Sequence, residues 1–166
     1  MTLQNKKHCP VCKMDIKEKH INYEFHKLKF FFCSEQCQDR FIANPHVYIA
    51  HWGRLSAKQR GECILKKRFI KLKRAVSSKV EKKLTNRLRA MMGVQEVSID
   101  GVNINICYDL IEVTLKQVES EIEQLVGFIK DDSLLERTKL TLIHYREEVE
   151  IDNLEQDIYS SNGHHH

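Results

Sequence analysis

The feature that most constrains this chain is a set of four cysteines near its N-terminus. Two residues separate Cys9 from Cys12, three separate Cys33 from Cys37, and 20 residues lie between the pairs. A two-residue spacing lets one tight turn point both sulfurs at a single ion, and thiolate is a preferred donor for zinc. The spacing therefore predicts one metal site with these four cysteines as ligands and zinc as the metal. Four thiolates leave no open coordination position, which favours a structural over a catalytic ion.

Two other interpretations of the cysteines stay open. Cys12 and Cys37 could be core thiols with Cys9 free, although this leaves the paired spacing unexplained. The first pair could be a redox motif, but nothing thioredoxin-like surrounds it. The other two cysteines, Cys63 and Cys107, stand alone in the sequence and are interpreted as structural or incidental thiols.

Length and composition set the broad class of the protein. The chain has 166 residues, of which 42% are hydrophobic, enough for one mid-sized domain or two small ones. No apolar run approaches the roughly 20 residues that a membrane span needs. The polar segment from Met1 to His8 lacks the apolar stretch of a secretory signal. We therefore expect a cytoplasmic protein without membrane insertion, whose cysteines bind metal rather than form disulfides. Residues Gly163–His166 resemble a purification tag.

Residues 8–49 predict a small module of their own. The first cysteine pair frames a tight turn, and the aromatic alternation that follows predicts a β-hairpin turning near residues 26–27. Ser34 is a good N-cap for a helix, which should end before Pro45 because the residue preceding a proline avoids helical geometry. Turn, hairpin and helix in this order are typical of treble-clef or zinc-ribbon-like modules.

A second region is predicted over residues 62–158, after a linker at 50–61 that contains two glycines and no clear periodicity. We expect a strand at 69–73, an amphipathic helix, a hairpin around Asp100-Gly101, a helix from Thr114 and a short strand at 127–129. The apolar stripe of the first of these helices comprises Val80, Leu84, Leu88 and Met91. The order β-α-β-β-α-β predicts a ferredoxin-like domain, so the fold class of the whole chain is α+β.

An extra C-terminal helix is predicted from Ser133 to about Asn153. Its expected buried stripe consists of Leu135, Leu142, Tyr145 and Val149.

The first region resembles the YHS/TRASH domain. The matching segments are Cys9–Asp15, Phe30–Cys37 and Phe41–Tyr48. This resemblance implies a zinc-binding, treble-clef-like module of the kind found in heavy-metal transporters, metal sensors and metal-trafficking proteins. The sequence departs from the family at Lys13, where glycine is usual, and at Phe32, where tyrosine is frequent, and neither departure removes an expected ligand.

The second region is similar to the heavy-metal-associated (HMA) domain, a ferredoxin-like copper-chaperone module. The similarity rests on the strand-helix order, on Met92-Gly93-Val94, on the strand at 97–99 and on Gly127-Phe128. The two cysteines of the HMA copper loop are replaced by Ser77 and Val80 in this chain. The resemblance therefore implies a degenerate HMA-like domain that lacks the two thiolates needed to hold copper(I).

The charges of the chain are divided into two blocks. Between Lys58 and Arg89 there are 13 basic and 2 acidic residues, whereas between Glu96 and Asp157 there are 16 acidic and 5 basic ones. We expect the blocks to compensate each other within the fold, with the basic helix beside the acidic C-terminal helix that carries Glu147, Glu148 and Glu150. Nucleic-acid binding is therefore not expected.

The sequence favours a metal-binding accessory protein that handles or senses zinc or copper, with the metal ion and a metal transporter or another protein as partners. The chain contains no nucleophile elbow, phosphate loop, HExxH motif or paired catalytic carboxylates, so no enzymatic activity is expected. The rival interpretation is an interaction module with a purely structural zinc, whose basic stretch binds nucleic acid or an acidic protein.

Overall fold

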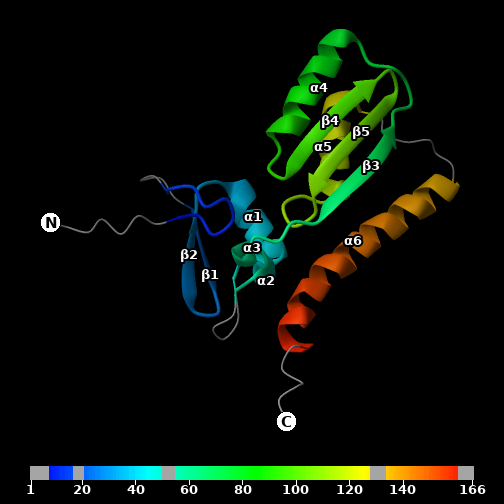
Figure 1. The fold of residues 1–166 in the computed structure, drawn as a ribbon. Coiled ribbons are helices and arrows are strands. Elements are labelled where there is room, and N and C mark those ends of the chain that lie inside the picture. The colour runs from blue at the N-terminus through cyan, green and yellow to red at the C-terminus, as the bar shows by residue number, and fades with distance from the viewer. Residues whose placement is uncertain (1–7, 17–20, 50–54, 128–133, 161–166) are drawn as a thin grey trace. The chain divides into compact units, whose positions relative to one another are not determined.

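The computed structural model describes residues 8–16, 21–49, 55–127 and 134–160. The chain forms two compact units: unit 1 comprises Met1–Gly61 with Leu154–His166, and unit 2 comprises Glu62–Asn153. Both units mix helices with a small antiparallel sheet (Figure 1). Among the described residues, no helix is both long and apolar enough to cross a membrane.

Unit 1 is built on a two-stranded hairpin of β1 (Ile21–Phe25) and β2 (Leu28–Phe32). The strands pair antiparallel from Ile21 with Phe32 to Phe25 with Leu28, which confirms the predicted hairpin. Its turn residues, His26 and Lys27, both have positive φ angles, of 50° and 65°. A two-residue turn of this kind matches the right-handed twist of the strands.

Three helices follow the hairpin. They are α1 (Glu35–Ala43), α2 (Pro45–Tyr48) and α3 (Ala57–Arg60). Ser34 caps α1 and Asn44 ends it directly before Pro45, as predicted. In α3, the side chains of Ser56 and Gln59 form a capping box, and Gly61 ends the helix in a left-handed conformation. The predicted linker at 50–61 is thus partly helical, because capping groups within it satisfy the ends of a single helical turn.

An aromatic core holds unit 1 together around Phe41 of α1, which is fully buried. Five other rings lie with their centroids 4.8–6.4 Å from the Phe41 ring: Tyr23, Phe25, Phe30, Phe32 and Tyr48. These separations are typical of interacting aromatic pairs. Because Phe41 follows Cys37 by one helical turn, this core fixes the helix that carries the last cysteine.

Unit 2 contains a three-stranded sheet in the order β3 (Leu65–Lys71), β5 (Asn103–Asp109), β4 (Val94–Asp100). Both outer strands are antiparallel to β5. The helix α4 (Ser78–Ala90) connects β3 to β4, and α5 (Leu115–Val126) follows β5. The hairpin around Asp100-Gly101 is confirmed. Leu84 and Leu88 of the predicted stripe are fully buried, and the first strand begins four residues earlier than expected.

A fourth strand was predicted at residues 127–129, but its first residue, Gly127, is not part of a strand. Gly127 instead ends α5 with a left-handed φ of 73°, and its N–H donates to the Glu123 carbonyl. Residues 128 and 129 lie outside the described residues. The strand order agrees with three strands of a split β-α-β arrangement, and the complete ferredoxin-like assignment stays a prediction.

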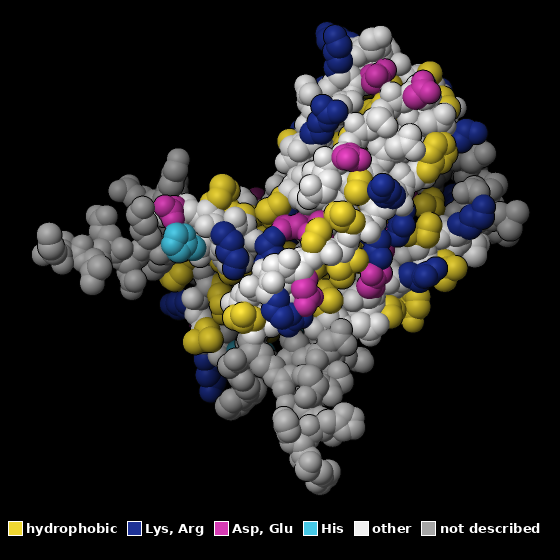
Figure 2. Space-filling view, in the orientation of Figure 1, with side chains coloured by type: hydrophobic (Ala, Val, Ile, Leu, Met, Phe, Trp, Pro, Cys, Tyr) yellow, Lys and Arg dark blue, Asp and Glu magenta, His cyan; other side chains and the backbone are white. Residues whose placement is uncertain are grey.

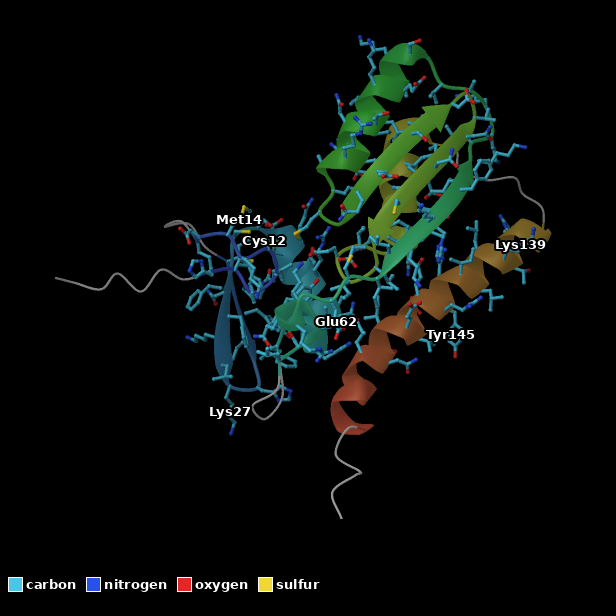
Figure 3. All side chains as sticks on the ribbon, in the orientation of Figure 1. Cys12, Met14, Lys27, Glu62, Lys139 and Tyr145 are labelled. Carbon is cyan, nitrogen blue, oxygen red and sulfur yellow. The ribbon has the colours of Figure 1, made fainter. Side chains whose placement is uncertain are left out.

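The C-terminal helix α6 (Leu134–Ser160) is present, but its predicted buried stripe is wrong. Leu142 and Tyr145 are 56% and 63% exposed, Val149 is also exposed, and the side chain of Leu135 lies outside the described residues. Tyr145 projects away from the strands (Figure 3). The buried face of α6 instead carries Glu147, at 2% exposure, because this carboxylate satisfies polar groups inside unit 2.

Candidate metal centre

Three structural elements of unit 1 carry the four cysteines. Cys9 and Cys12 lie on the first turn, Cys33 directly follows β2, and Cys37 is in the first turn of α1. The structure brings together all four residues that the sequence predicts. Cys12 and Met14 lie at one end of this unit and Lys27 of the hairpin turn at the other (Figure 3).

The first turn is closed by backbone hydrogen bonds. The N–H of Cys9 donates to the Met14 carbonyl and the N–H of Lys13 donates to the Cys9 carbonyl, both at 3.0 Å. Lys13 has a left-handed φ of 64°. This geometry explains why glycine suits position 13 in the family that the sequence resembles, and it shows that lysine is accommodated there.

The start of α1 orients the second pair. The Ser34 hydroxyl accepts a hydrogen bond from the Cys37 backbone N–H at 3.3 Å, which caps the helix. With Cys33 just before the cap and Cys37 three residues after it, the two Sγ atoms lie 3.6 Å apart. This arrangement was predictable from the local sequence, because Ser34, a good N-cap residue, stands between Cys33 and Cys37.

The four sulfur atoms all lie within 4.8 Å of one another. The Sγ atoms of Cys12 and Cys33 are 3.3 Å apart, and all four cysteines are free thiols rather than disulfides. Zinc–sulfur bonds of about 2.3 Å in a regular tetrahedron would place the sulfurs about 3.8 Å from each other. The cluster therefore fits a single four-coordinate metal ion without rearrangement of the backbone.

Exposure differs between the members of the cluster. Cys9 and Cys37 are buried, at 0% and 6%, whereas Cys12 and Cys33 are half-buried. His8 pairs with Asp15, with 2.8 Å between Nδ1 and Oδ1, and both side chains are exposed. Within the described part of the chain, the group of possible metal ligands consists of the four thiols and does not include His8.

The thiol pKa values reflect burial and hydrogen bonding. Burial alone would raise the pKa of Cys9, but backbone N–H groups of Cys12, Cys33 and Val11 stabilise its thiolate and bring the pKa below its ordinary value. Burial and the neighbouring thiols raise the pKa of Cys12 to about 11, and burial also raises that of Cys37. Gathering four thiolates thus requires a compensating positive charge, which a bound dication supplies.

In comparison with known protein families, residues 8–52 match the family model of the YHS domain. No curated protein and no solved structure matches the chain. The matched segment contains all four cysteines, so the family match and the sulfur cluster coincide. Together they define a small cysteine-rich module of a metal-binding type. The HMA-like character of the second region stays a hypothesis.

Proposed function

We propose that this chain is a cytoplasmic, non-enzymatic accessory protein that handles or senses a heavy metal through Cys9, Cys12, Cys33 and Cys37. The observation that carries the proposal is the convergence of four sulfurs within 4.8 Å in a segment that matches the YHS domain. Zinc is the preferred ion because it favours closed tetrahedral sites of four thiolates, and copper is the alternative because it also binds soft thiolate donors.

Metal content tests this proposal directly. The full chain, purified after expression with added zinc or copper, should contain one metal ion per molecule by elemental analysis. Its X-ray absorption spectrum should show a sulfur shell at about 2.3 Å for zinc. The double variant Cys12→Ser/Cys33→Ser should lose the ion, because two oxygens replace two of the four soft donors. A Cys63→Ser control should retain it, and equal metal content in all three proteins would contradict the proposal.

We also propose that unit 2 is a ferredoxin-like, degenerate HMA-like domain without a copper(I) site of its own. The strand order of its sheet supports this assignment. Ser77 and Val80, at the expected thiolate positions, lie at the N-cap and in the first turn of α4. A metal transporter or another protein that receives the ion is the partner this function requires.

A second candidate function rests on the basic residues of α4. Lys79, Lys82 and Lys83 are exposed, and Glu150 and Glu147 of α6 pair with Lys66 and Arg68 of β3. Among the described residues, the expected pairing of α6 with α4 is not seen. A structural zinc module that binds nucleic acid through α4 would then be the alternative. Titration with duplex DNA and single-stranded RNA at about 150 mM salt distinguishes metal handling from nucleic-acid binding. Binding tighter than about 10⁻⁶ M would favour the nucleic-acid-binding module.

A further inference from the structure

The two faces of the sheet in unit 2 differ sharply. Alternate residues of each strand, including Ile70, Ile104, Ile106 and Val97, are buried on the face that meets the helices. The opposite face, called the open face here, consists of Lys67, Phe69 and Lys71 of β3, Asn103, Asn105 and the buried Cys107 of β5, and Glu96, Ser98 and Asp100 of β4. Figure 1 shows α5 on the far side of the strands.

The open face exposes apolar surface beside charge. Phe69 is 61% exposed, and Leu65 in the same strand is 57% exposed on the same side. A hollow of about 610 Å³ lies on this face, lined by residues of all three strands and by Arg89 of α4. Figure 2 shows hydrophobic, basic and acidic side chains interspersed on the surface of this unit. The open face thus combines two exposed apolar side chains with the Lys67 charge between them.

The strand register arranges the open face in three rows. Lys67 is paired with Cys107 and Cys107 with Glu96, which gives the first row. The second row is Phe69, Asn105 and Ser98, and the third is Lys71, Asn103 and Asp100. Each row therefore begins with a basic or bulky residue on β3 and ends with an acidic or small residue on β4.

This pattern is complementary to itself. A twofold axis parallel to β5 would place β3 of one molecule over β4 of another and keep each row opposite its own copy. Lys67 would then face Glu96, Lys71 would face Asp100, and the bulky Phe69 would lie over the small Ser98. We propose that the open face is a homodimer interface formed by two copies of this chain related by such an axis.

The charge pattern also disfavours another way of stacking two copies. A twofold axis perpendicular to the strands would place β3 over β3, so that the lysines of one copy face the lysines of the other. Like charges in this position cost several kcal/mol. Among the described residues, none of the four charged side chains Lys67, Lys71, Glu96 and Asp100 has an ion-pair partner within its own chain, so all four are available to a second copy.

The size of the open face sets the expected affinity. Three strands of seven residues cover about 23 Å by about 14 Å, and aligned sheets pack with their mean strand directions within about 30° of each other. This is about 320 Å² on each copy, below the size of standard stable interfaces and in the range of weak, transient contacts. We therefore expect a reversible dimer with Kd on the order of 10⁻⁵ M.

Charge reversal in the full chain tests the proposal. Sedimentation from about 1 μM to about 1 mM brackets the expected affinity and should show a monomer–dimer equilibrium. The variants K67E/K71E and E96K/D100K should each weaken association by about tenfold or more, because every facing pair becomes like-charged. Their equimolar mixture should form a heterodimer, since one face is then wholly acidic and the other wholly basic. Recovery in the mixture also shows that both variants are folded.

The matched control is K79E/K82E, which changes the net charge as much as K67E/K71E does but on exposed residues of α4. This control should dimerise like the unaltered chain. The proposal is overturned if the unaltered chain is monomeric throughout, if K67E/K71E dimerises as well as the control, or if the mixture of charge-reversed variants stays monomeric.

Discussion

Removal of the metal from the four-cysteine centre is expected to unfold residues 8–49 and leave residues 62–153 folded. The hydrophobic core of unit 1 is one cluster of rings around Phe41, and domains this small usually need a metal or a disulfide for stability. Structural zinc contributes about 10–16 kcal/mol in isolated zinc-finger peptides. Without the ion, the clustered thiols provide no comparable stabilisation.

Hydrogen exchange on the full chain measures this effect in both units at once. After treatment with a strong chelator, amides in β1, β2 and α1 should lose their protection, whereas those in β5 should keep it. Cys12→Ser should produce the same pattern without chelator, and Cys63→Ser should not, because Cys63 is exposed and outside the cluster. Unchanged exchange in residues 8–49 after elemental analysis has shown metal loss would contradict the prediction.

The parts of the fold that the sequence predicts correctly are those decided by local chemistry. Ser34 and Pro45 bound α1 as expected, because an N-cap oxygen and a helix-incompatible residue act within one turn. The hairpin around Asp100-Gly101 follows for the same reason. The positive φ angles at His26 and Lys27 were not predictable, since neither glycine nor asparagine marks those positions. At Lys13 the only indication was the glycine that is usual there in the YHS family.

The clustering of Cys9, Cys12, Cys33 and Cys37 was predictable from their spacing, whereas the packing of α6 was not. The spacing of the cysteines predicts which sulfurs lie close together, because the first turn brings Cys9 near Cys12 and the start of α1 brings Cys33 near Cys37. The orientation of α6 depends instead on a buried carboxylate that satisfies distant groups in β3, β5 and at the start of α5. The apolar stripe predicted the wrong buried face of α6, because Leu142 and Tyr145 are exposed and Glu147 is buried.

Glu147 makes three contacts that hold α6 against the rest of unit 2. Its Oε1 accepts from the Tyr108 hydroxyl and, at 3.0 Å, from Arg68 Nη2, and its Oε2 accepts from the Leu115 backbone N–H at 2.8 Å. Burial and the adjacent carboxylate raise the pKa of Tyr108 above its ordinary value, so the hydroxyl remains the donor. Leu115 begins α5, and its N–H has no acceptor within that helix.

Glu147→Ala is therefore expected to lower the free energy of unfolding of unit 2 by about 3 kcal/mol, because it leaves buried donors without an acceptor and Arg68 without its counter-charge. The value is at the low end for a broken buried pair because the Arg68 side chain is 26% exposed and can be rehydrated. Urea denaturation followed by circular dichroism measures the loss, and proteolysis within α6 should accelerate. The neighbouring Glu148→Ala, on the exposed face of α6, should change stability by no more than about 0.5 kcal/mol. Equal effects of the two substitutions would show that Glu147 does not anchor the helix.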